Sequence, residues 1–123
     1  MSIKVEDYDD ALSAGYAVEF LSQQHRAPFF LACGLFRPHL PWYVPQDYFD
    51  RYPLQDIVLP TIREDDLDDL PRGGLKFAKA RRQDFETIQK ADKWKHAVRA
   101  YLASITYADD QLGRILRALD NSQ

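Results

Sequence analysis

The sequence predicts an α/β fold, and three patterns along the chain support this prediction. Residues 7–24 have the spacing of an amphipathic helix, and an unbroken apolar run follows at residues 29–36. A second, longer helical pattern extends from residue 92 to about residue 120. An apolar run without alternation is typical of a strand covered on both faces, as strands are in a parallel sheet. The order helix, buried parallel strand, long loop, long amphipathic helix therefore indicates part of such a sheet.

The first helix is expected to start with a polar cap and to face the core along one stripe. Asp9, Asp10 and Ser13 are the candidates for the cap, because short polar side chains accept hydrogen bonds from the free amides of a first turn. The predicted core-facing residues recur at helical spacing: Leu12, Tyr16, Phe20 and Leu21. The segment that ends in Pro28 closes the helix, since the residue before a proline is biased away from the helical conformation.

The apolar run leads into a short loop, residues 37–41, with the sequence Arg-Pro-His-Leu-Pro. Its two prolines fix their own φ and bias the preceding residues, Arg37 and Leu40, toward extended conformations. Ligands of parallel α/β sheets gather at the carboxyl ends of the strands. His39 is therefore a candidate functional residue. The alternative is a loop histidine whose ring is satisfied by backbone carbonyls.

Cys33 lies inside the apolar run and is the one cysteine of the chain. No internal disulfide is possible, so cysteine usage does not indicate a redox compartment. We expect Cys33 to be a small buried core residue. A nucleophilic or metal-binding role is the alternative, and the absence of a cationic neighbour in the sequence argues against it.

The middle of the chain, residues 37–79, combines proline, aromatic and acidic residues and predicts a long ordered loop. Aromatic side chains in this number need to bury area. Residues 46–52 are expected to make one helical turn, and residues 56–59 a short extended piece. The charge run at residues 63–69 is predicted to be a solvated loop. Cation binding is the alternative, but the run lacks the glycine and terminal glutamate of a calcium loop.

The last element is predicted to be a long helix with Asp92 as its N-cap and Asn121 as its C-terminal stop. Its side chains at three- and four-residue intervals form an apolar stripe that is expected to face the core. The stripe consists of Trp94, Val98, Tyr101, Leu102, Ile105, Ala108, Leu112, Ile115, Leu116 and Leu119. His96, between lysines, is expected to point to solvent.

One buried strand cannot satisfy its own backbone, and each unpaired buried group costs about 1–3 kcal/mol. The sequence offers no matching set of strands, because its other apolar residues have helical spacing. A parallel sheet requires several helix-strand units. We therefore expect the missing strands to lie outside these residues, so that the chain is a piece of a larger α/β protein.

Composition and charge argue against several classes of function. The chain is 46% hydrophobic and 28% charged, which is typical of a folded globular domain. A net charge of -3 provides no basic field for a phosphate backbone, so a nucleic-acid partner is not expected. The longest apolar stretch, residues 29–36, is far shorter than the roughly 20 residues of a membrane span. The first ten residues lack the basic start and apolar centre of a signal peptide.

Residues 28–42, Pro-Phe-Phe-Leu-Ala-Cys-Gly-Leu-Phe-Arg-Pro-His-Leu-Pro-Trp, resemble a segment of the sulfatases, especially of the iduronate-2-sulfatase and choline-sulfatase-like branch. In that family a Pro-Phe-Phe-Leu strand precedes Lys/Arg-Pro-His-x-Pro. Residues 45–53 and 57–60 are similar to the loop that follows, and residues 101–116 resemble the helix before the next core strand. The resemblance implies an alkaline-phosphatase-like α/β fold, of which residues 1–123 form a central part of the catalytic domain without its flanking core strands.

The resemblance also implies a chemistry. Sulfatases hydrolyse sulfate esters with a formylglycine, made from the cysteine of a Cys-x-Pro-Ser-Arg motif, and a calcium ion held mainly by aspartates. Cys33 is followed by Gly-Leu-Phe, and the metal-ligand motifs would fall outside this chain, so both features are expected only in the full-length protein. His39 matches the family histidine that contacts the sulfate and helps protonate the leaving oxygen. Arg37 stands where relatives often have lysine and would add positive charge near an anionic substrate. Trp42 and Tyr43 are candidates for the pocket rim, although packing explains them equally well.

The leading hypothesis is that the intact protein is a sulfuric ester hydrolase acting on a sulfated small molecule or carbohydrate. The isolated chain is expected to be inactive. The alternative is a non-catalytic binding or assembly module, or a decayed sulfatase fragment, in which the long helix docks on a partner that supplies the missing sheet. The resemblance leads us to expect a periplasmic or secreted protein.

Overall fold

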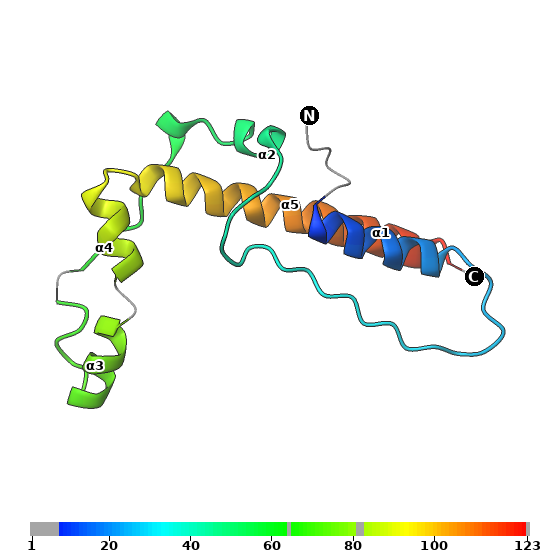
Figure 1. The fold of residues 1–123 in the computed structure, drawn as a ribbon, viewed down its shortest axis with the longest axis horizontal. Helices are drawn as coiled ribbons and strands as arrows, with labels where there is room; N and C mark the ends of the chain where they lie inside the picture. Colours follow the sequence, from blue (N-terminus) through cyan, green and yellow to red (C-terminus); the bar gives the residue numbers. More distant parts are fainter. Residues whose placement is uncertain (1–7, 64, 81–82, 123) are drawn as a thin grey trace. The chain divides into compact units, whose positions relative to one another are not determined.

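A computed structural model describes residues 8–63, 65–80 and 83–122 of the chain. Figure 1 shows the elements in order: α1 (Asp9–Leu21), α2 (Gln46–Asp50), the 3-10 helix η2 (Leu54–Asp56), α3 (Arg72–Ala80), α4 (Gln83–Lys90) and α5 (Trp94–Asp120). The chain divides into two compact units. The described part of the first unit comprises residues 8–52 and 100–122, and that of the second lies within residues 53–99.

The core of the first unit lies where α1 runs beside α5 in the same direction (Figure 1). Small side chains line this contact. Ala14 of α1 and Ala103 of α5 are both fully buried. Larger aromatic side chains close the core at the start of α1, where the Tyr107 hydroxyl accepts a hydrogen bond from the Ala11 amide at 3.1 Å. The buried cluster consists of Ala11, Val44, Tyr48, Ala103 and Tyr107.

The two residues that follow the short helix α2, Arg51 and Tyr52, hold it against α5 through polar contacts. Arg51 forms an ion pair with Asp110 at 3.2 Å and lies over the ring of Tyr48 at 4.7 Å. The Tyr52 hydroxyl shares a hydrogen bond with Thr106. The single helical turn predicted at residues 46–52 is thereby confirmed, with bounds Gln46–Asp50.

The ionisation of Tyr48 couples the stability of this unit to alkaline pH. Burial and a hydrogen bond to Asp110 raise the pKa of Tyr48 from 10.0 to about 12. Between these values the folded state keeps the proton while the unfolded state releases it, so stability present below pH 10 is lost as the pH rises toward 12. We expect the free energy of unfolding to fall with rising pH in this window, by at most about 1.4 kcal/mol per pH unit for this one proton. Urea unfolding followed by circular dichroism at pH 9 and pH 11.5 measures this loss.

Tyr48→Phe provides the control for this prediction. The variant cannot ionise at this position, so its decline between pH 9 and pH 11.5 is expected to be shallower than that of the unmodified chain. Some decline remains, because burial also raises the pKa of Tyr107. Parallel declines in the two proteins would contradict the assignment to Tyr48.

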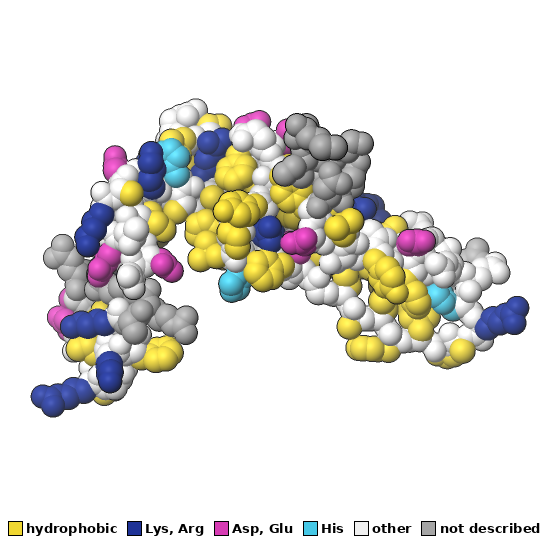
Figure 2. Space-filling model, viewed as in Figure 1, with side chains coloured by type: hydrophobic (Ala, Val, Ile, Leu, Met, Phe, Trp, Pro, Cys, Tyr) yellow, Lys and Arg dark blue, Asp and Glu magenta, His cyan; other side chains and the backbone are white. Residues whose placement is uncertain are grey.

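The apolar faces that the sequence predicts as core are only partly buried here. Leu21 of α1 is buried, as predicted. On α1, Leu12 and Tyr16 lie on the surface, with Tyr16 69% exposed, while the alanines and Asp10 are buried. The residues of the predicted α5 stripe that are exposed by 38–50% are Tyr101, Ile105, Leu112, Leu116 and Leu119. Hydrophobic side chains accordingly gather at the surface in Figure 2. Periodicity identifies an apolar face but not its partner. Of these side chains Tyr101 packs against Trp42, with ring centroids 5.7 Å apart, and still stays 43% exposed.

The predicted buried strand at residues 29–36 is not confirmed. The segment is an irregular connection between α1 and α2 (Figure 1), and no β-strand forms in the described ranges. Phe30 is 92% exposed and Cys33 is also exposed, so the prediction that both are buried is wrong for this chain. The physical reason is the absence of neighbouring strands: the Cys33 thiol reaches only the Ser13 carbonyl of α1, at 3.6 Å.

The predicted N-terminal helix caps are also wrong. The N-cap of α1 is Tyr8, without a side-chain hydrogen bond, and the proposed start of this helix at residue 7 lies outside the described residues. Asp92 does not cap α5 but follows α4 at a φ of 53°, with its amide bonded to Gln89 at 2.9 Å. Asn121 does mark the end of α5, where its side-chain amide donates to the Arg117 carbonyl at 2.6 Å.

The second unit contains two helices, α3 and α4, that the sequence analysis did not predict. The adjacent glycines Gly73 and Gly74 weaken the helical pattern of α3, because glycine costs about 1 kcal/mol in a helix interior relative to alanine. The expected extended piece at residues 56–59 instead begins in η2. His96 is exposed, as predicted. None of the described helices has both the length and the apolar character that crossing a membrane requires.

Candidate functional site

The predicted site loop, defined here as the His39 loop (residues 36–43), closes on itself through backbone and side-chain hydrogen bonds. The His39 amide donates to the Phe36 carbonyl at 3.0 Å, and the indole of Trp42 donates to the Pro38 carbonyl at 2.9 Å. The Arg37 guanidinium donates twice to the Tyr43 carbonyl, at 3.1 and 3.0 Å. Residues 37 and 43 are thus tied together, and the loop has a defined shape at the end of the extended segment.

His39 lies at the exposed tip of this loop. Its Nδ1 is 2.7 Å from the Leu40 carbonyl, and its ring packs on that of Phe36 with centroids 4.9 Å apart. A carbonyl only accepts hydrogen bonds, so Nδ1 carries a proton. Nε2 then holds the lone pair of the neutral ring or the second proton of the imidazolium. It has no hydrogen-bond partner among the described residues, and it is the atom available to a ligand.

Arg37 is half-buried and is oriented by the loop. Its guanidinium also lies over the Phe36 ring, at 5.4 Å. It forms no ion pair with another described residue, so its positive charge is held by a neutral carbonyl. An anion brought to this side of the loop would meet a cation that is already fixed in place.

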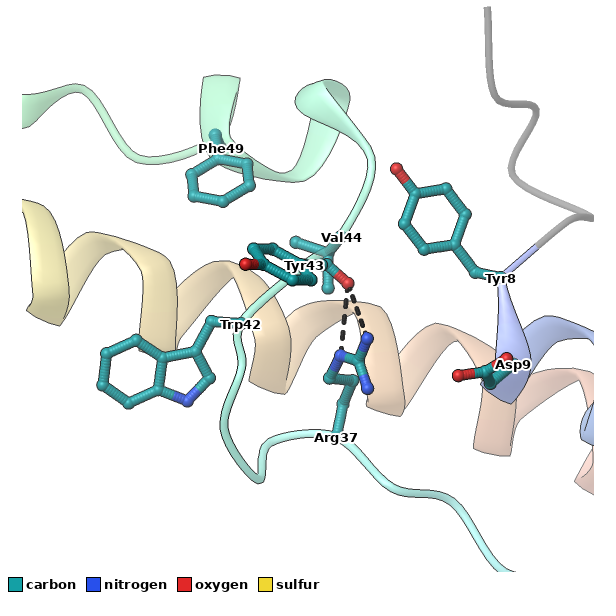
Figure 3. Close-up of a pocket in the computed structure, with 7 residues that line it drawn as sticks. All are labelled: Tyr8, Asp9, Arg37, Trp42, Tyr43, Val44 and Phe49. Atoms are coloured by element: carbon teal, nitrogen blue, oxygen red, sulfur yellow. Dashed lines mark hydrogen bonds between the residues drawn. The ribbon is translucent and has the colours of Figure 1, made fainter.

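A cavity of about 480 Å³ opens beside the loop, as Figure 3 shows. Its wall is mostly aromatic, with Trp42 and Tyr43 from the loop and Phe49 from α2. Arg37 and Asp9 supply the charged groups. The complete lining is Tyr8, Asp9, Arg37, Trp42, Tyr43, Val44 and Phe49. A concave, largely apolar site of this size with a few polar groups is typical of small-molecule binding.

The structure brings some predicted residues together and adds others. Arg37, Trp42 and Tyr43 line the cavity, whereas His39 does not. Tyr8 and Asp9 were missed as lining residues because they lie more than 25 positions earlier in the sequence, where only tertiary packing places them beside the loop.

Asp10 has a different role in the structure from the helix cap that the sequence predicts. It is 2% exposed, and its two carboxylate oxygens accept the backbone amides of Phe36 and Arg37 at 2.6 and 3.0 Å. The sequence suggests a helix cap because acidic residues are common in a first turn. The signal that could have indicated burial of Asp10 is its position on the same face of α1 as the buried alanines.

In the part of the chain that the structure describes, the side chains do not fit the metal expected for the whole protein, and Cys33 does not fit the modified cysteine. The described residues contain no group of three or more His, Cys, Asp or Glu side chains placed to hold a metal ion. Cys33 is exposed near Ser13, and the sequence after it is not Cys-x-Pro-Ser-Arg. No chemical step through either group is therefore assigned to these residues.

Comparison with known proteins identifies related chains. A family model described as Sulfatase matches residues 2–123. A sulfatase of Formosa agariphila is 41% identical over 114 residues, which are 92% of this chain and 22% of the relative. The iduronate 2-sulfatase of Homo sapiens is 31% identical over 93% of this chain and 23% of its own length, and an arylsulfatase of Clostridium perfringens is 32% identical over 84% and 21%. The chain thus spans about a fifth of these relatives. No solved structure gives a significant match.

Proposed function

Because this chain belongs to the sulfatase family, we propose that it is part of an enzyme that hydrolyses sulfate esters and that the His39 loop forms one wall of the active site. The supporting observation is the loop geometry. The Leu40 carbonyl fixes the imidazole through Nδ1 and leaves Nε2 without a described partner. A preoriented, accessible imidazole beside a fixed guanidinium suits an anionic ester.

The proposed chemistry of His39 is proton donation. Cleavage of the sulfur-oxygen bond places negative charge on the bridging oxygen, which becomes an alcohol when it takes up a proton. The imidazolium form carries a proton on Nε2 that it can give to this oxygen. The bond from Nδ1 to the Leu40 carbonyl is retained during the transfer and keeps the ring in place. Arg37 contributes positive charge on the same side of the loop.

The proposed substrate class is a sulfated carbohydrate. The flat aromatic wall of Trp42, Tyr43 and Phe49 suits the apolar face of a sugar ring, while Asp9 and Arg37 provide partners for hydroxyl groups and anions. One relative is named iduronate 2-sulfatase, and iduronate is a sugar acid. The cavity and the His39 loop share Arg37, Trp42 and Tyr43, which supports the proposal that a sugar ring binds next to the proton donor.

The remaining parts of the active site are proposed to come from the rest of the protein. These parts are the calcium ion, the formylglycine and the strands that pair with residues 29–36. Residues 29–35 make no backbone hydrogen bond to another described residue, and much of the apolar stripe of α5 is exposed. Both features are explained if further strands of the same polypeptide cover them. A periplasmic or secreted location remains a proposal from the family.

A non-catalytic assembly module is the second candidate, and the exposed α5 stripe is the observation that favours it. In that case the stripe and residues 29–36 would dock on a separate partner protein. The intact protein would then bind this partner without releasing sulfate from any ester.

The isolated chain and the intact protein are expected to differ completely in activity. We expect the intact protein to release sulfate from an aryl sulfate, and the purified 123-residue chain to release none and to bind no calcium tightly. Sulfate release measured by ion chromatography and calcium binding measured by calorimetry check both points. Turnover by the isolated chain would contradict the division of the site proposed here, and an inactive intact protein would favour the assembly module.

A further inference from the structure

Asp10 is a buried carboxylate whose two oxygens are both occupied by backbone amides. The partners are the consecutive N–H groups of Phe36 and Arg37, at 2.6 and 3.0 Å. It forms no ion pair with a described residue. Consecutive amides that converge on one anion are a recognised binding arrangement, and hydrogen bonds to a charged acceptor are about twice as strong as neutral ones. The contact joins α1 to a segment 26 residues later in the chain.

Two hydrogen bonds together fix the peptide group between Phe36 and Arg37, and one of them is the bond from the Arg37 amide to Asp10. The peptide between Phe36 and Arg37 gives its N–H to Asp10, and its carbonyl accepts the His39 amide at 3.0 Å. The orientation of this peptide plane therefore sets the position of the His39 backbone. The guanidinium of Arg37, which starts from the same residue, in turn holds the far end of the loop at Tyr43.

We propose that Asp10 is a positioning residue that holds His39 in the orientation needed for proton donation. The inference rests on the proposed role of His39 and concerns how α1 supports it. Asp10 lies too deep to contact the substrate, since it is 2% exposed, and it acts through the peptide that carries His39. The first turn of a helix also favours a negative charge, which stabilises the carboxylate where it stands.

The test uses Asp10→Asn in the intact protein. Asparagine keeps the shape of the side chain but presents an NH₂ group to one of the two backbone N–H groups, so at least one hydrogen bond is lost. We expect kcat for an alkyl or sugar sulfate to fall by about 10-fold to 100-fold with KM little changed, because a displaced catalytic group affects the transition state. Glu19→Gln is the matched control. Glu19 is an exposed acid on the same helix, and its variant is expected to retain full activity.

Two further readouts separate positioning from a general loss of structure. Hydrogen-deuterium exchange should increase at the amides of Phe36 and Arg37 in Asp10→Asn while peptides from α5 keep their protection. A double-mutant cycle with His39→Ala should be strongly non-additive, because Asp10 has little left to position once the imidazole is gone.

Each outcome of these experiments decides a separate point. Unchanged exchange at Phe36 and Arg37 would overturn the anchoring by Asp10. Increased exchange with unchanged kcat, or with effects that add to those of His39→Ala, would overturn the positioning role while leaving the anchor in place. If the unmodified intact protein releases no sulfate, the proposed function fails, and the positioning role fails with it. The exchange data then still show whether Asp10 holds the loop.

Discussion

Replacing His39 by alanine in the intact protein is expected to lower turnover of an alkyl or sugar sulfate by about 10²–10⁴-fold, the usual contribution of a general acid. The side chain is at the loop tip, and the loop is closed by other groups: the His39 backbone amide, the Trp42 indole and the Arg37 guanidinium. Alanine keeps the backbone amide. The loss is therefore expected in the chemical step and not in folding, with a change in unfolding free energy within about 0.5 kcal/mol.

The leaving group of the substrate provides the sharpest readout for His39. A nitrophenolate leaves without much help from an acid, whereas an alkoxide needs a proton. The activity ratio between the unmodified protein and His39→Ala should therefore be small for nitrophenyl sulfate and large for an alkyl sulfate. His96→Ala, a change of another exposed histidine, should leave both activities unaltered. Equal losses on both substrates would rule out proton donation by His39, and unaltered turnover on both would remove it from the site.

Tyr107→Ala is expected to have the largest effect on stability, a loss of about 3–5 kcal/mol in the free energy of unfolding. Tyr107 is 1% exposed and lies at the centre of the first unit. Its ring packs edge-on against Tyr48 with centroids 5.1 Å apart and lies 6.0 Å from Tyr8. Its hydroxyl accepts the Ala11 amide in the first turn of α1. Truncation leaves a cavity and an unpaired buried amide at the same place.

Two control variants separate these contributions. Tyr107→Phe keeps the ring and removes only the acceptor, for which we expect a loss of about 1–3 kcal/mol. Tyr16→Ala removes a tyrosine that is 69% exposed on the opposite side of α1, and a change within about 0.5 kcal/mol is expected. Urea unfolding followed by circular dichroism measures all three. Similar losses for Tyr107→Ala and Tyr16→Ala would show that the α1–α5 core is not as described.

The comparison of sequence and structure is clearest in α5. Its existence, its length and its end at Asn121 follow from local pattern, because helical periodicity and a stop signal depend on nearby residues alone. The choice of its buried face does not. The structure buries Ala103 and Tyr107 in the core beside α1 and leaves much of the predicted apolar stripe exposed, because periodicity alone does not say which face meets a neighbour.

The candidate site likewise combines features that follow from local sequence with features that depend on distant contacts. The order of an apolar segment and a histidine between prolines is local information, and it was enough to single out His39, whereas Arg37 was added by the resemblance to the sulfatases. The contribution of Asp10 was not predictable, because a carboxylate in a first turn predicts a cap unless its distant partners are known. Strand formation at residues 29–36 likewise requires hydrogen bonds from chain that lies elsewhere in sequence.

The sequence by itself determined the family, the positions of α1, α2 and α5, and the candidate residues Arg37 and His39. Each of these depends on residue types and short spacings. Only the tertiary structure decided that Asp10 binds the start of the His39 loop, that Tyr8 and Asp9 border the cavity beside it, and which helix faces meet. Those features depend on contacts between residues far apart in the chain, which local periodicity does not encode.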